Sequence, residues 1–392
     1  MSAYAKQKSR SPAARLQAGL TLTELLVSLA LSATLMAGLT KVLYALRVSD
    51  RSQEGNSRMQ EAGQFAITFL GEDIRMAGYL GCSSTLNTAQ INSMLVAPPA
   101  SFQPMQGIQG WEANNTDPGT INNHAANVAV TSTSTGWETT GGNVLENINV
   151  LPGTDIIRVW GGGDSLTTPG FAQEGTINSI TPPPLFNVIN TSVMDVSAGD
   201  ILLLSDCEQA DIVQACTVTG VGGPPITSQN IGLTNTCSPG NTATPLQTLP
   251  GGSVNILSGN LYYIGKRGDI ATNPPSLFRR SLGSNGGLGS AVELIEGVAN
   301  MQILYGENNN NDAENSVDSF VPADQVSDWS DVVAVRISFL VQSIEDNLGQ
   351  SPLAYSYNGV TYDGAGLNGE LPADNRLRRV FSTTIGIRNR VL

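Results

Sequence analysis

The sequence predicts an α+β protein in which a long N-terminal helix packs on an antiparallel β-sheet with large β-rich and loop insertions. Three observations predict it: an apolar run near the N-terminus, an amphipathic continuation with a helical period, and strand-like segments that all follow it. The expected segments are a leader at 1–19, a transmembrane helix at 20–46, its amphipathic continuation at 47–81, and a β-rich exported domain at 82–392.

The apolar run is long enough to cross a bilayer. Between Leu20 and Thr40 the only ionisable side chain is Glu24, and about 20 apolar residues span the hydrocarbon core. Four basic residues and no acid precede the run, at Lys6, Lys8, Arg10 and Arg15. By the positive-inside rule this end stays cytoplasmic and the rest of the chain is exported.

Glu24 is the anomaly of this helix. A charged side chain inside a membrane span costs about 2.5–3.5 kcal/mol even on lenient insertion scales. We therefore expect the carboxylate to have a partner.

The helical pattern continues beyond the apolar run. Apolar residues recur at steps of three and four through Phe65, Phe69, Leu70 and Ile74, with charged residues between them and the membrane. Gly78 and Gly81 predict that the helix ends near Tyr79.

Composition bounds the function. Only 14% of residues are charged, while 42 Gly and 20 Pro indicate a turn-rich, exported β protein. The net charge of −13 disfavours nucleic acid as a principal partner, because phosphate binding needs clustered basic residues. The single histidine, His124, has a loop context of Asn residues, so no Ser-His-Asp arrangement is expected and the chain is not predicted to be an enzyme.

Four cysteines occur, and none form a C-x-x-C pair. In an exported protein they predict two structural disulfides, worth about 2–4 kcal/mol each, rather than a zinc site. The favoured pairs are Cys82–Cys207, which would tie the helix end to the sheet, and Cys216–Cys237, which would close a Gly/Pro loop. Cys207–Cys216 is the alternative.

The clearest strands are the last two. Residues 331–342 and 379–388 alternate with a period of two, so that Val335, Ile337 and Phe339 share one face while Arg336 and Ser338 share the other. A connection rich in Gly, Pro and Asn lies between them.

One loop resembles a calcium-binding loop, with oxygen donors at Asn308, Asn310, Asp312 and Asp318. The glycine of the sharp turn and the terminal glutamate are missing. We expect a solvated strand connection and no resident cofactor, with calcium as the alternative ligand.

The basic leader followed by Gly19-Leu-Thr-Leu-Thr-Glu24 resembles the processing site of type IV prepilins. The resemblance implies that a prepilin peptidase cuts between Gly19 and Leu20 and methylates the new N-terminus of Leu20. It also implies that Glu24 pairs with the Leu20 amine of a neighbouring subunit during assembly. The family usually has Phe at the first mature position, where this chain has Leu. A secretory signal peptide or an uncleaved anchor is the alternative, but neither explains the acid.

Further blocks resemble the PilW family of minor pilins. They are Met59–Ala66, Glu72–Cys82, Asp200–Cys207, Met301–Gly306, Trp329 with Val332–Ser338, and Arg379–Arg390. The resemblance implies a pilin-like fold and a low-abundance subunit that joins other minor and major pilins in a complex that starts pilus assembly. It implies a tip location beside an adhesin-like protein, and a role in twitching motility.

The same resemblance implies a single-pass inner-membrane protein before assembly, with its domain in the periplasm, and an extracellular location in the pilus afterwards. Two other interpretations remain open. One is a minor pseudopilin of a type II secretion system, and the other is a membrane-anchored ectodomain that binds calcium or a glycan.

Overall fold

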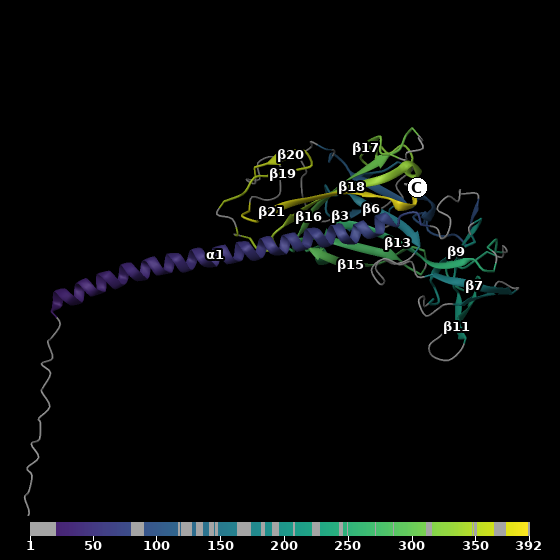
Figure 1. Cartoon of the computed structure of the whole chain (residues 1–392), viewed down its shortest axis with the longest axis horizontal. Coiled ribbons are helices and arrows are strands. Elements are labelled where there is room, and N and C mark those ends of the chain that lie inside the picture. The colour runs from purple at the N-terminus through teal and green to yellow at the C-terminus, as the bar shows by residue number, and fades with distance from the viewer. Residues whose placement is uncertain are drawn as a thin grey trace, which may run out of the picture. The chain divides into compact units, whose positions relative to one another are not determined.

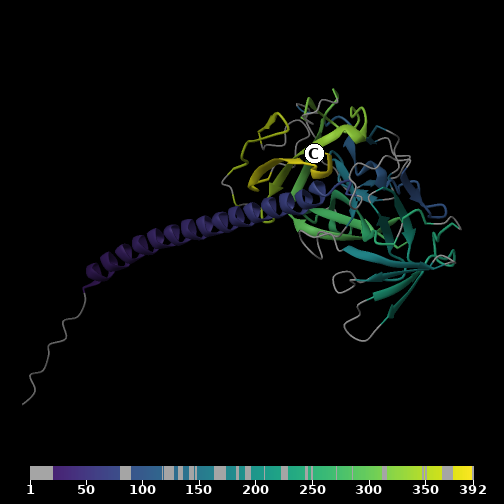
Figure 2. The same ribbon diagram turned by 45° about the vertical axis from the view of Figure 1, so that its right-hand side comes forward.

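The structure is a computed structural model. It describes residues 21–79, 90–116, 118, 128–130, 136–140, 145, 148–162, 174–181, 185–189, 196–206, 208–221, 228–242, 246–248, 250–270, 272–284, 286–310, 316–346, 348, 351–363 and 374–390. An N-terminal helix is followed by a strand-rich region (Figure 1; Figure 2). The protein is therefore of the α+β class with a long N-terminal helix, as the sequence predicts.

The chain divides into two compact units, residues 1–53 and 54–392. The helix α1, Leu22–Arg75, contributes residues to both. In the first unit its side chains from Leu22 to Leu46 are all exposed, and this apolar segment meets the length and hydropathy of a membrane span.

The second unit contains all the described strands. A 13-stranded sheet is formed by β1 (Ile91–Ser93), β2 (Ile108–Ala113), β4 (Trp137–Glu138), β6 (Ile156–Gly162), β7 (Glu174–Thr181), β8 (Leu185–Ile189), β9 (Ile201–Ser205), β10 (Ala210–Gln214), β11 (Thr217–Val221), β12 (Ser228–Gly232), β13 (Ser253–Lys266), β14 (Pro275–Leu282) and β15 (Leu288–Glu296). The four-stranded sheet has the order β17 (Ser319–Val321), β16 (Val298–Glu307), β18 (Val332–Gln342) and β21 (Arg378–Gly386). Two small pairs join β3 (Val128–Val130) to β5 (Ile148–Val150) and β19 (Tyr355–Tyr357) to β20 (Val360–Tyr362).

Strand β13 organises the larger sheet. Its first residues pair with β7 and β9, and its later residues pair with β6 and β14. Gly259 lies in the part of β13 that pairs with β6, opposite Trp160, and an added Cβ there would be 2.3 Å from the Trp160 ring. The absence of a side chain there lets the strand pass over the tryptophan, so one 14-residue strand serves two groups of partners.

The main core lies between the C-terminal part of α1 and both sheets. Met59, Ala66, Leu70 and Ile74 of the helix are buried together with residues of β13, β16, β18 and β21. These helix residues follow the three- and four-residue spacing of the sequence, which places them on one face. Each sheet therefore has a face that is covered by the same helix.

The helix ends earlier than its sequence pattern predicts. It stops at Arg75 rather than near Tyr79, and the chain turns through Met76–Gly78. Gly78 has a φ of +70°, and its N–H donates to Trp160 O at 2.8 Å instead of continuing the helical ladder. Glycine adopts this left-handed conformation without steric cost, so Gly78 completes the turn that leaves the helix.

Several strands differ from the sequence pattern. The strand-like segment Ile212–Thr219 belongs to two strands, β10 and β11, because the chain breaks at Ala215 and Cys216. The strands β2, β7 and β8 were not predicted. Polar residues and glycine within β7 hide its alternation, although Ile177 is buried.

Candidate functional site

The start of α1 gives Glu24 a partner within its own chain. Thr21 precedes the first helical residue, and its N–H and Oγ1 donate to Glu24 Oε2 at 3.3 and 3.2 Å. In return, the Glu24 N–H donates to Thr21 Oγ1 at 3.4 Å. This reciprocal arrangement is a capping box, which satisfies backbone N–H groups that have no helical acceptor.

Thr21 is a residue that the sequence interpretation missed, although the Thr-x-x-Glu spacing was available as a signal. The carboxylate also lies in the first turn, where the helix dipole favours a negative charge. The local structure therefore orients Glu24 at the helix start. Gly19 and Leu20, the expected cleavage site, lie outside the described residues, so processing stays a prediction.

The second unit holds the helix by a buried polar contact as well as by apolar packing. Asp73 is only 7% exposed, and its Oδ2 accepts hydrogen bonds from Asn260 Nδ2 and Tyr262 Oη, both at 2.6 Å. Burial, and then the neighbouring Asp73 charge, raise the pKa of Tyr262 well above its ordinary value, so the phenol remains a donor. The contact joins α1 to the middle of β13.

Close backbone packing accompanies this contact. A Cβ added to Gly63 would lie 2.5 Å from the Phe381 ring of β21, so the ring occupies the space above the glycine. Just over two turns later, a Cβ added to Gly71 would lie 3.6 Å from Ile385 of the same strand, an ordinary contact distance. The last strand of the chain is thus pressed against its first helix.

The residues after β21 secure the end of α1. The Asn389 side chain donates to Ala77 O at 3.2 Å, a carbonyl just beyond the last helical residue. Arg390 donates to Trp329 O, to Val332 O at 2.9 Å and to Gln106 O. Burial lowers the pKa of Arg390 to about 10, which leaves its guanidinium charged at neutral pH.

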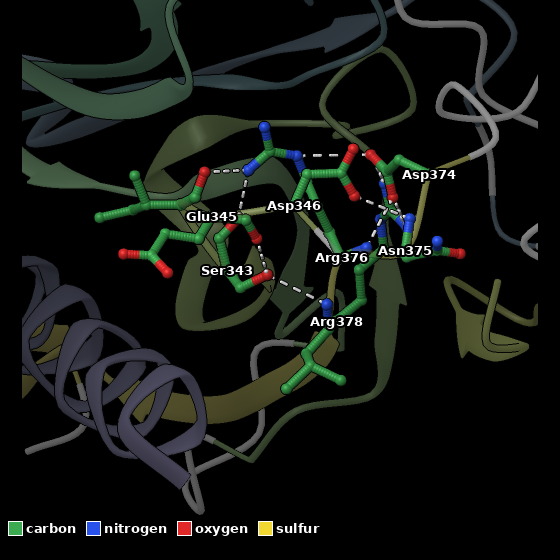
Figure 3. Close-up of polar contacts among 9 residues, drawn as sticks. Ser343, Glu345, Asp346, Asp374, Asn375, Arg376 and Arg378 are labelled. Carbon is green, nitrogen blue, oxygen red and sulfur yellow. Dashed lines mark hydrogen bonds and ion pairs between the residues drawn. The ribbon is translucent and has the colours of Figure 1, made fainter. Parts of the chain in front are cut away.

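A polar cluster closes the base of the long connection between β18 and β21 (Figure 3). Arg378 donates to the Asp374 carboxylate through two nitrogens, both at 2.9 Å. Arg376 donates to Ser343 O at 2.7 Å, and the Ser343 and Leu377 backbones are bonded at 2.8 Å. These bonds fix where β21 enters the sheet.

The structure joins Cys216 and Cys237 by a disulfide with a Cα–Cα distance of 5.3 Å. Cys216 precedes β11 and Cys237 follows β12, so the bond links the two ends of this strand pair. It is one of the two expected pairs, and it excludes the Cys207–Cys216 alternative. Cys82 and Cys207 lie outside the described residues, and their pairing stays a prediction.

The loop with calcium-like donors is held by its own amides where it is described. Asp318 accepts from the Asn309 and Asn310 N–H groups at 2.9 and 3.2 Å and from Asn310 Nδ2 at 3.0 Å. The N–H of Asn308, a buried residue, donates to Asp331 O at 3.0 Å. These bonds belong to the connection between β16 and β17, and calcium binding by this loop stays untested.

Asp312 and His124 lie outside the part of the chain that the structure describes. Within that part, no group of three or more His, Cys, Asp or Glu side chains is placed to hold a metal ion.

Two family models match the chain. Residues 261–389 match the family described as type IV pilus-assembly protein W, and residues 14–40 match the prokaryotic N-terminal methylation motif. The first match covers β14–β21 and ends at Asn389, and the second contains Gly19, Leu20 and Glu24. No curated protein and no solved structure gave a match to the chain.

Proposed function

We propose that this chain, a type IV pilus protein of the PilW family, is a minor pilin that helps to prime pilus assembly and remains at the pilus tip. The observation that carries the proposal is the combination of both family matches with an apolar run, residues 20–40, whose only ionisable side chain is Glu24, three residues after its capping partner Thr21. Its role is structural: it contributes binding surfaces rather than chemistry.

In this proposal, prepilin peptidase removes residues 1–19 and methylates Leu20. The segment 20–46 holds the protein in the inner membrane with its domain in the periplasm, and later lies among other pilin helices. Glu24 then exchanges its bonds with Thr21 for the charged amine of a neighbouring subunit. The exchange is favourable because an ion pair between two groups in lipid offsets part of the desolvation of each.

The domain supplies partner contacts. Other minor and major pilins pack against it, and an adhesin-like protein lies at the tip. The capping box supports this role for Glu24, since a carboxylate already positioned at the helix start needs little reorganisation to meet an incoming amine.

Glu24→Val tests the proposal. We expect the variant to insert into the membrane at the wild-type level but to lose surface pili and twitching motility, because the neighbour's amine has no acid to meet. Immunoblots of membranes, pilus counts by electron microscopy and motility zones measure these outcomes. Glu61→Val, at an exposed position of the same helix, is the matched control and should assemble normally. Normal piliation of Glu24→Val would contradict the role assigned to this acid.

Intact mass of the membrane-extracted protein tests the processing step independently. We expect the loss of residues 1–19 and the gain of one methyl group. A protein that keeps its basic leader, or that is cut on the far side of the apolar run, would overturn the assignment as a pilin.

A further inference from the structure

Strand β21 forms an edge of the four-stranded sheet that differs from the other edges of the molecule. It pairs with β18 over nine residues in unbroken register, and it contains no proline. The edges at β1 and β17 are only three residues long, β11 has five residues, and the pairing of β15 has two register shifts. Proteins usually shorten, distort or cover exposed edges to avoid unwanted pairing. A long and regular edge in such a molecule needs an explanation.

The register identifies the backbone groups that face outward. Opposite residues of an antiparallel pair alternate between hydrogen-bonded and non-bonded positions. Just beyond the two ends of β21, Ile387 N donates to Val333 O and Ser343 N donates to Leu377 O, at 2.9 and 2.8 Å. The bonded positions of β21 are therefore the odd-numbered residues.

It follows that the N–H and C=O groups of Val380, Ser382 and Thr384 point away from β18. Within the described chain, these backbone groups make no hydrogen bond to any residue, and an added Cβ at Gly386 would meet nothing within 4 Å. Ser382 and Thr384 are exposed. Among the residues that the structure describes, no strand pairs with the outer edge of β21, and another strand can add there at the usual spacing of about 4.8 Å.

The charge around this edge is opposite to that of the molecule. The chain as a whole has a net charge of −13, but residues 374–392 have five arginines and a single acid, Asp374, which pairs with Arg376 and Arg378. Arg379 and Arg388 are exposed, and Arg336 of the adjacent strand lies on the same sheet, with its Nε 3.4 Å from Thr384 Oγ1. A partner strand that carries acidic side chains is the complement of this surface.

We propose that the open edge of β21 binds an extended, acidic strand of a partner pilin subunit by β-strand addition. Main-chain hydrogen bonds to Val380, Ser382 and Thr384 supply the affinity, and the arginines select an acidic partner. The inference rests on the proposed function only for the identity of the partner.

The test uses the full chain in detergent, alone and co-purified with the other minor pilins of the same pilus system. Hydrogen–deuterium exchange is followed at single-residue resolution along β21. We expect the amides of residues 380, 382 and 384 to exchange rapidly in the free protein and at least tenfold more slowly in the complex. The amides of residues 381 and 383, already bonded to β18, should be protected in both states.

Ser382→Pro removes one outward N–H without removing a main-chain bond to β18; it also loses the hydrogen bond that Ser338 Oγ donates to Ser382 Oγ, which Ser382→Ala loses as well. We therefore expect roughly tenfold weaker binding of Ser382→Pro to the partner pilins and little change in the thermal midpoint. Ser382→Ala keeps the N–H and is the matched control, with binding as in wild type. Arg379→Glu, on the exposed surface, provides a second variant that should weaken binding even if the proline disturbs folding.

The outcomes separate the two proposals. A complex that forms normally, with residues 380, 382 and 384 unprotected and Ser382→Pro binding as in wild type, overturns strand addition and leaves the proposed function standing. Protection of the same amides by a second copy of this chain overturns the choice of partner. No complex between the wild-type chain and any minor pilin counts against both proposals.

Discussion

At the scale of single residues, the contacts that matter most are buried polar ones. Asp73 lies in an apolar core and accepts two short hydrogen bonds from residues of one strand. Buried charge is costly unless it is hydrogen-bonded, so Asp73 fixes one orientation and one register of α1 on the sheet. A leucine at this position would pack but would not define where along β13 the helix lies.

We therefore expect Asp73→Ala to lower the free energy of unfolding by about 2–4 kcal/mol, because Asn260 and Tyr262 would lose a common acceptor. Urea unfolding of the full chain in detergent measures the change. Asp73→Asn keeps one carbonyl acceptor and should cost less. Glu61→Ala, on the exposed side of the helix, should change stability by less than about 0.5 kcal/mol. Equal stability of Asp73→Ala and Glu61→Ala would show that the contact contributes little.

At the scale of elements, the close approach between helix α1 and strand β21 depends on glycine in the helix. Gly63 lies directly under the Phe381 ring, whereas Gly71 faces side chains at ordinary contact distances of 3.5 and 3.6 Å. Both glycines are buried helical positions, so they differ mainly in the space above them.

Because of this difference, alanine substitutions at Gly63 and Gly71 are a matched pair of variants. Gly63→Ala should destabilise the protein by about 1–3 kcal/mol, because the Phe381 ring must move away from the helix. Gly71→Ala should be neutral or stabilising by up to about 1 kcal/mol, because alanine has the higher helix propensity and finds space there. Thermal unfolding of the two variants measures the sign of the change in stability. A destabilisation of the same size at both positions would contradict the close approach at Gly63.

At the scale of the whole molecule, three buried tyrosines connect different parts of the second unit. Burial raises the pKa of Tyr262, Tyr305 and Tyr357 well above the ordinary value of 10.0. Tyr262 lies on β13, Tyr305 on β16 and Tyr357 on β19. Each phenol keeps its proton because its phenolate form would be buried away from water and would lie near a carboxylate.

These raised pKa values determine how the stability of the protein changes with pH. Above pH 10 the unfolded chain releases these protons and the folded protein keeps them, so stability is complete below pH 10 and falls as the pH rises further. Each tyrosine contributes up to about 1.4 kcal/mol per pH unit. We expect a nearly constant thermal midpoint from pH 7 to 9.5 and a steep fall above pH 10, shallower in Tyr357→Phe. An unchanged midpoint at pH 11 would contradict the prediction.

The sequence predicts the class of the fold and the positions of its strongest elements. The helical stripe through Leu70 and Ile74 and the alternation through Val335 and Ile337 are both present, because burial on one face leaves a periodic signal in the chain. The first half of β13 has no such clear period, since it pairs with β7 and β9 up to Ile256 and with β6 from Leu257. Pairing between strands that are distant in the sequence leaves no periodic pattern of apolar residues in either segment.

The candidate site was predicted in part. Glu24 was identified from its chemistry, but Thr21 as its partner depends on a capping geometry that was overlooked. Asp73 was visible as one acid among many, and its role depends on Asn260 and Tyr262, which lie almost two hundred residues later. The open edge of β21 depends on the strand order, which the sequence does not state.

The packing of Phe381 on Gly63 has a consequence for biosynthesis. The core beneath α1 combines residues from Met59 to Ile387, so ribosomal synthesis must deliver nearly the entire chain before that core can close. Contacts between the two ends of a chain form slowly, and until then the apolar stripe of the helix stays open to solvent and to misassociation. Chaperones that shield the first helix until the last strand arrives would therefore raise the yield of folded protein.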